Sequence, residues 1–171
     1  TAHLFTALFG PAGCTQIAMM EIGNGRPPGE GDMEPLSWAI WNLAKSIDSV
    51  QAMGAGFMLQ AFARQIVTWA SQYDAVLTPA LAELPLPLGT MSTMDTEEPM
   101  AGFTRSAQFT PFTAISNVTG SPAISVPLAQ SAEGLPIGVQ LIGRPAQEGN
   151  LLALATQLEF ARPWASRRPG D

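Results

Sequence analysis

Side chains that could hold a metal ion or a cofactor are few in this sequence and lie far apart. His3 is the only histidine and Cys14 the only cysteine. A metal site needs several imidazole, thiolate or carboxylate ligands at fixed spacing, and no acidic pair stands at helical spacing from either residue. The glycine-rich segment 23–31 lacks the strand before it and the helix start after it that a phosphate-binding loop requires. We therefore expect neither a metal ion nor a cofactor.

No residue stands in a recognised nucleophile motif. The sequence has no G-x-S-x-G elbow and no S-x-x-K pair, since Asn42 stands three residues before Lys45, where a serine would be needed. Ser121 has a turn setting, with no base nearby in the sequence. His3 and Cys14 could pair as base and nucleophile, but a lone cysteine among apolar residues is more typical of a core. The residues alone predict no self-sufficient active site.

The composition restricts the function classes. The chain has 171 residues, the length of one domain. Hydrophobic residues make up 46% and charged residues 13%, against roughly 25% charged in soluble domains. Either further polypeptide or a partner subunit, such as a second copy, covers apolar surface, or Ser, Thr and Gln form the outer surface. A net charge of −6 argues against nucleic-acid binding.

The sequence contains no membrane signal. No apolar run approaches the roughly 18 residues of a membrane span, and no basic-headed signal peptide is present. The single Cys14 excludes an internal disulfide and favours the cytoplasm. Thr1 stands in an apolar segment without an initiator methionine, which suggests a cut or processed end.

Helical patterns dominate the first part of the chain. Residues 2–22 predict a helix broken or kinked near Pro11, and 23–32 a surface loop. A helix from Pro35 to Lys45 and a long one capped by Asp48 or Ser49 follow. The long helix has an apolar stripe that predicts one buried face: Val50, Met53, Phe57, Met58, Ala61, Phe62, Ile66 and Trp69.

Residues 84–110 have a loop-like composition. A loop this long is typically a lid, a binding loop or a packed excursion. Glu97 and Glu98 suggest acid–base chemistry, although a solvated loop explains them better. The side chains of Phe103, Phe109 and Phe112 either line an apolar substrate pocket or hold the loop against the core.

Strand patterns follow on both sides of that loop. Residues 75–79 predict a short strand that ends at Pro79, and residues 123–128 and 137–143 predict a hairpin. The last helix, 147–160, has an apolar face: Leu151, Leu154, Ala155, Leu158 and Phe160. Helices interleaved with short apolar strands indicate an α/β architecture.

Three segments resemble the amidase signature family, in the same order and at the same spacing. Asn117–Pro127 reads NVTGSPAISVP, Gly134–Pro145 reads GLPIGVQLIGRP, and Tyr73–Pro79 reads YDAVLTP. Each is similar to a segment near the C-terminal end of that family, and the likeness extends over 35–169. Any one segment alone would be weak, but the ordered set is specific.

The resemblance implies a fold class and a domain organisation. The expected fold is α/β, the C-terminal part of the amidase-signature fold, with a mixed β-sheet flanked by helices. Residues 1–171 would form a single incomplete domain. Its parts would be a helical region 1–72, a loop and strand region 73–146, and a C-terminal helix and tail 147–171.

The resemblance also implies where a site would lie. Family members use two serines and a lysine from an earlier Gly/Ser-rich core, and nothing here corresponds to them. No catalytic residue is therefore assigned to this chain. The residues just before and within the NVTG segment would line the acyl pocket: Phe112, Thr113, Ser116 and Asn117. Alternatively, Asn117 and Thr119 satisfy backbone groups in a turn that leads to the strand.

The function implied is that of the C-terminal portion of a serine-dependent amidase, inactive alone. It would hydrolyse a small carboxamide to a carboxylate and ammonia or an amine, with the N-terminal catalytic part of the same enzyme as its partner. Two alternatives are a non-catalytic scaffold or binding subunit and an amidotransferase subunit of the same family. The Phe-containing segment favours a plain amidase.

Overall fold

The structure is a computed structural model that describes residues 2–94 and 97–167, with side chains from residue 6 onward. The chain divides into two compact units. The first contains 1–62 and 87–108, and the second 63–86 and 109–171. In the described part of the chain, no helix is long and apolar enough to cross a membrane.

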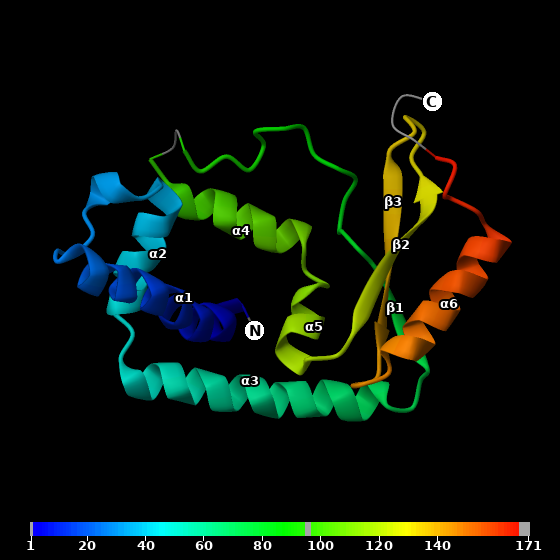
Figure 1. The fold of residues 1–171 in the computed structure, drawn as a ribbon, viewed down its shortest axis with the longest axis horizontal. Helices are drawn as coiled ribbons and strands as arrows, with labels where there is room; N and C mark the ends of the chain where they lie inside the picture. Colours follow the sequence, from blue (N-terminus) through cyan, green and yellow to red (C-terminus); the bar gives the residue numbers. More distant parts are fainter. Residues whose placement is uncertain (1, 95–96, 168–171) are drawn as a thin grey trace. The chain divides into compact units, whose positions relative to one another are not determined.

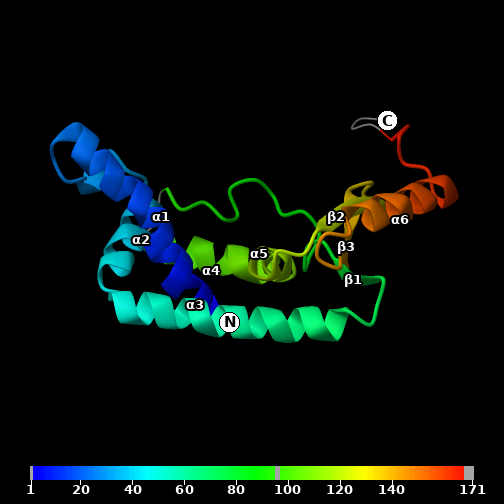
Figure 2. The same ribbon diagram turned by 60° about the horizontal axis from the view of Figure 1, so that its bottom comes forward.

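The first unit is helical. It contains α1 (Ala2–Asn24), the 3₁₀ turn η1 (Glu30–Asp32), α2 (Pro35–Lys45), most of α3 (Ser49–Ala70) and α4 (Pro99–Phe109). Helices α1 and α2 lie side by side in both ribbon views (Figures 1 and 2). Their shared core consists of buried side chains from both helices: Cys14, Trp41 and Ala44.

Helix α1 is not broken at Pro11, so the predicted break is wrong, whereas the alternative of a kink stays a prediction. The helix continues from Ala2 to Asn24 with Pro11 inside it. Proline removes one N–H from the helical ladder, and the carbonyl of Pro11 accepts a hydrogen bond from the Thr15 hydroxyl at 3.0 Å.

Helix α3 begins as predicted, but it buries a different face. The Asp48 carboxylate accepts from the Gln51 N–H at 2.8 Å and the Gln51 side chain accepts from the Asp48 N–H at 3.0 Å, which is a reciprocal cap. Ala55 and Leu59 are buried, and Leu8 approaches to 3.6 Å from where a Gly56 Cβ would stand. Gly56 of α3 thus lies beside Leu8 of α1.

The apolar stripe predicted to be the buried face of α3 is largely exposed. Its exposed members have relative exposures of 40–78%: Val50, Met53, Phe57, Met58, Phe62 and Trp69. The reason for the error is that periodicity identifies an apolar face without identifying what covers it.

The loop predicted over 84–110 contains a helix. Helix α4 begins at Pro99, where proline suits a first helical turn, and the Thr104 hydroxyl donates to the Met100 carbonyl at 3.0 Å. A Cβ at Gly102 would stand 2.7 Å from Thr93 Cγ2. Only glycine therefore allows the segment around Thr93 to pack this closely against α4.

The second unit contains an antiparallel sheet. Within the described residues it has three strands in the order β1-β3-β2: β1 (Ala75–Pro79), β2 (Ala123–Gln130) and β3 (Pro136–Gly143). The predicted strands and hairpin are confirmed. Strand β2 has a register shift between Val126 and Ala129, and the carbonyl of Pro127, inside the shift, accepts from the Arg167 guanidinium at 3.2 Å.

Helix α6 (Glu148–Ala161) follows the sheet along one side (Figure 1). Leu151 and Ala155 are buried, as predicted. Gly143 at the end of β3 leaves room for Leu151, whose Cγ would lie 3.0 Å from a Cβ at that position. Phe160 is 83% exposed, so its predicted inward position is wrong; it lies in the last turn of α6, one residue before the helix ends.

Candidate functional site

The four predicted pocket residues lie on or just before α5 (Ala114–Thr119), in the second unit. This short helix replaces the turn expected before β2. Thr113 precedes the helix, and its hydroxyl donates to the Thr110 carbonyl at 3.2 Å. Within the described residues it makes no side-chain cap bond. Phe112 and Ser116 are half-buried, whereas Thr113 and Asn117 are exposed.

The end of α5 is built by Thr119 and Gly120. The Thr119 hydroxyl donates to the Ile115 carbonyl at 2.8 Å and accepts from the Ser121 N–H at 3.2 Å. Gly120 has a φ of 68°, which suits glycine, and its N–H donates to the Ser116 carbonyl at 2.8 Å. The structural role predicted for Thr119 is therefore confirmed. The Asn117 side chain makes no such bond to any described residue.

Ser116 has an unused hydroxyl. Its Oγ is inaccessible to solvent and has no hydrogen-bond partner among the described residues. Buried hydroxyls are normally paired, because an unpaired one loses its bonds to water without compensation. The Ser116 hydroxyl therefore has unmet hydrogen-bonding capacity, which a group outside the described chain can use only where the atoms that cover Oγ move aside.

Gln140 connects the start of α5 to the sheet, and sequence reasoning missed it. It is the buried polar residue in the middle of β3, with 5% exposure. Its amide Nε2 lies 3.1 Å from Thr78 Oγ1 on β1 and 3.5 Å from the Phe112 carbonyl oxygen. The sequence did contain a signal, namely a single amide side chain inside an apolar strand. Such a side chain needs hydrogen-bond partners when it is buried.

The remaining candidates are divided between the two units. The Phe109 side chain is buried and its carbonyl accepts from the Ala82 N–H at 3.0 Å, which supports the anchoring role. Glu97 and Glu98 are exposed. Phe103 belongs to the first unit.

Cys14, the nucleophile of the pair considered in the sequence, is buried. Burial raises the pKa of the Cys14 thiol above its ordinary value, although the charge on Lys45 acts against this. That shift opposes thiolate formation at neutral pH. The side chain of His3 lies outside the described residues. Among the described residues, no group of three or more His, Cys, Asp or Glu could hold a metal ion.

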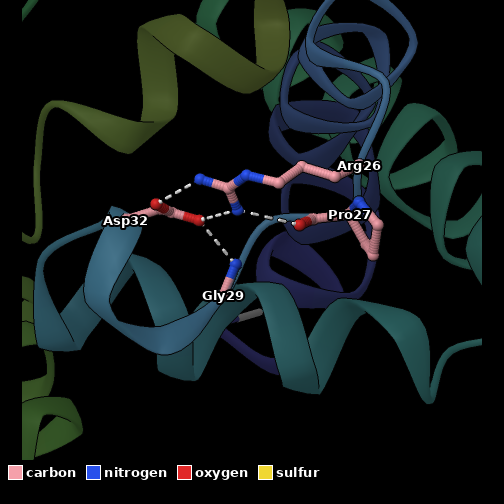
Figure 3. Close-up of polar contacts among 4 residues, drawn as sticks. All are labelled: Arg26, Pro27, Gly29 and Asp32. Atoms are coloured by element: carbon pink, nitrogen blue, oxygen red, sulfur yellow. Dashed lines mark hydrogen bonds and ion pairs between the residues drawn. The ribbon is translucent and has the colours of Figure 1, made fainter.

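The first unit has a cavity of about 420 Å³ beside the loop that follows α1. Arg26 and Asp32 form a two-armed ion pair at 2.6 and 2.8 Å, and Asp32 also accepts from the Gly29 N–H at 2.8 Å (Figure 3). A further Arg26 donor reaches the Pro27 carbonyl. Hydrogen bonds from Arg26 and Gly29 hold the pKa of Asp32 well below its usual value. These charged groups stabilise the loop and offer no nucleophile or base.

Comparisons with known proteins identify the family. The family model described as Amidase matches residues 40–152. The 6-aminohexanoate-cyclic-dimer hydrolase of Paenarthrobacter ureafaciens is 37% identical over 159 residues, which cover 85% of this chain and 30% of that protein. The chain therefore spans about a third of this relative.

Solved structures agree with this match. A structure of 6-aminohexanoate cyclic dimer hydrolase complexed with substrate is 30% identical, with a TM-score of 0.87, and covers 98% of this chain and 36% of that one. A bacterial aryl acylamidase of the amidase signature family is 20% identical with a TM-score of 0.74, a likeness in fold alone. Sequence and fold together show that this chain belongs to the amidase signature family and corresponds to part of its longer members.

Proposed function

We propose that this chain is the C-terminal portion of a serine-dependent amidase, which hydrolyses a carboxamide to a carboxylate and ammonia or an amine. The observation that carries the proposal is the continuous match over residues 40–152 to the amidase family. The hydrolase relative, whose name describes cleavage of a cyclic amide dimer, supports an amide substrate. The partner would be the N-terminal catalytic part of the same enzyme, in the cytoplasm.

In this proposal the two parts have different tasks. The N-terminal part supplies the nucleophilic serine, the second serine, the lysine and the oxyanion donors, which stabilise negative charge in the transition state. This chain supplies three strands of sheet core and one wall of the acyl pocket. The wall is formed by α5 and the residues before it: Phe112, Thr113, Ser116 and Asn117.

The polarity of the wall suggests how it would contact an acyl group. Phe112 offers a half-buried aromatic ring, and Ser116 a hydroxyl without a described partner. A pocket of mainly apolar character with one or two placed polar groups is typical of small-molecule sites. Ser116 would then form a hydrogen bond with the substrate or with a group of the N-terminal part.

The exposed stripe of α3 supports a covering partner. In the first unit its exposed members include Val50, Met53 and Phe57, and contiguous apolar side chains of this kind mark interaction surfaces. We propose that the N-terminal part of the enzyme covers them. The alternative is that a second copy of this chain covers the stripe. The two possibilities predict different oligomeric states, which sedimentation would measure.

The test compares the chain with and without its partner. The purified 171-residue chain should not hydrolyse a simple aryl amide, whereas the chain produced together with its N-terminal part should. Full hydrolysis by the chain alone would refute the proposal. A sample without any co-purifying N-terminal peptide in mass spectrometry would favour the non-catalytic scaffold.

The pocket wall has its own test. Ser116→Ala removes a hydroxyl without a described partner, so the free energy of unfolding should change by less than about 0.5 kcal/mol. In the assembled enzyme the same change should raise KM severalfold. Ser125→Ala, an exposed serine on β2, is the matched control. If Ser116→Ala and Ser125→Ala had the same KM, Ser116 would not be part of the pocket wall.

A further inference from the structure

We propose that Gln140 is a positioning residue for the acyl-pocket wall, acting on the backbone at the start of α5. This inference rests on the proposed function, because it concerns the wall that the proposal assigns to this chain. Gln140 lies on β3, the middle strand within the described sheet, opposite Thr78 on one side and Ser125 on the other. Its side chain contacts the segment before α5 through the Phe112 carbonyl.

The local environment explains why this residue is an amide. Leu141 and Ile142, which follow it on β3, are buried, and so is Gln140 itself. A buried amide costs free energy unless its donors and acceptors find partners. The two hydrogens on Nε2 match two acceptors, the Thr78 hydroxyl at 3.1 Å and the Phe112 carbonyl at 3.5 Å. An apolar side chain of the same length would fill the space without making either bond.

The Phe112 carbonyl is the point at which this network reaches the pocket wall. The same oxygen accepts from the Ile115 N–H at 3.3 Å, which is the first turn of α5. Within the described residues Thr113 provides no side-chain cap for that turn. The first turn of α5 is therefore held by backbone bonds to the Phe112 and Thr113 carbonyls, the second of them from the Asn117 N–H at 3.5 Å. Gln140 connects the Phe112 carbonyl to the sheet.

This arrangement predicts an effect on substrate binding rather than on the chemical step. Loss of the amide donor frees the Phe112 backbone, and with it the aromatic ring of Phe112 and the hydroxyl of Ser116 that follows one turn later. The serines and the lysine of the proposed mechanism are not on this chain. The contribution of these serines and this lysine to kcat should therefore stay the same in a Gln140 variant.

The structural part of the test uses hydrogen exchange and needs no activity. Gln140→Met keeps the length of the side chain and removes both donors. In this variant the amides of residues 113–116 should exchange about fivefold faster, the value of one neutral hydrogen bond of about 1 kcal/mol. Exchange in the β2–β3 hairpin should stay unchanged. Ser125→Ala, in the same row of the sheet, should change neither region.

A second variant separates the two acceptors of Gln140. Thr78→Val removes the Thr78 hydroxyl but leaves the bond to Phe112, so exchange in 113–116 should remain near the wild-type rate. Gln140→Glu keeps the shape and can accept from the Thr78 hydroxyl, but its carboxylate has no proton for the Phe112 carbonyl. It should behave like Gln140→Met. Because a buried carboxylate itself lowers stability, Gln140→Leu provides the test if the methionine variant does not fold. Wild-type exchange in 113–116 for these Gln140 variants would overturn the proposal.

Kinetics of the assembled enzyme complete the test. Gln140→Met should raise KM about fivefold with kcat within twofold of the wild type, a split that a general loss of folded protein would not give. An unchanged KM with an active wild type refutes the positioning role. A wild-type assembly without amidase activity refutes the proposed function instead, and the exchange result still decides whether Gln140 holds the start of α5.

Discussion

Replacement of Leu151 by alanine tests how α6 is held on the sheet. Leu151 is 3% exposed. Its Cγ, Cδ1 and Cδ2 lie 3.0, 3.2 and 3.3 Å from the point that a Cβ on Gly143 would occupy. The leucine side chain therefore fits into the space that the missing side chain of Gly143 leaves open. The size of the side chain at position 143 therefore limits the size of the side chain at position 151, and the reverse is also true.

The expected magnitude follows from the atoms removed. Alanine deletes three carbons, and at about 0.8 kcal/mol for each buried methylene the transfer contribution is about 2.4 kcal/mol. The cavity left behind adds to this, so we expect a loss of about 3 kcal/mol, within the range of about 2–5 kcal/mol for core leucines. Gly143→Ala alone should cost about 1–3 kcal/mol through overpacking.

The double variant provides the sharper result. In the Leu151→Ala background the new methyl group on residue 143 enters space that the leucine has vacated. The combined loss should therefore be smaller than the sum of the two single losses, by about 1–2 kcal/mol.

Urea unfolding at constant m-value measures these free energies, and hydrogen exchange in β3 reports on the second unit alone. Leu152→Ala is the matched control, because Leu152 is 61% exposed on the same helix, and it should cost less than about 0.5 kcal/mol. Equal losses at 151 and 152, or strict additivity with Gly143→Ala, would contradict this account of the contact.

Three further predictions concern backbone geometry and charge. Gly120→Ala forces an alanine to a φ of 68° and should lower stability by about 1–2 kcal/mol in thermal unfolding; no loss would exclude the left-handed cap. Gly138→Ala places a Cβ 2.9 Å from that of Ala80 and should cost about 1–3 kcal/mol in the same assay; an unchanged stability would contradict the close contact with Ala80. The pKa of Asp32 is lower in the folded loop than its ordinary 3.8. The ion pair with Arg26 therefore stabilises the folded loop fully above about pH 3.8, and this stabilisation is lost as the pH falls toward the folded pKa. Exchange of the Gly29 amide, relative to Asp32→Asn, should therefore accelerate below about pH 4, and a constant ratio would contradict the contact.

The sequence predicted best those elements whose pattern is local. The strand ending at Pro79 and the hairpin that follows it carry apolar runs and turn residues within a few positions, and the structure confirms them. Helix α4 was missed because its one glycine and one threonine, Gly102 and Thr104, have low helix propensity. Its close packing at Gly102 depends on a segment about ten residues away, which no local pattern reveals.

Contacts that depend on register could not be predicted. Gln140 meets Thr78 because β1 and β3 pair antiparallel with those two residues opposite each other. The sequence shows an amide within an apolar strand but does not give its partners. For α3, in the same way, the stripe containing Met53 and Phe57 could be identified, whereas its exposure depends on which polypeptide lies against it.

The register shift in β2 also limits how the sheet can grow. In the described sheet β2 is an outer strand, and Pro127 has no N–H, while its carbonyl is already bound by Arg167. A further strand can therefore pair with Ala123–Val126 but must leave the edge at Pro127. This short edge gives little template for fibril-like stacking of one copy on another. The same proline thus sets both where a neighbouring strand can join and where the growth of an aggregate stops.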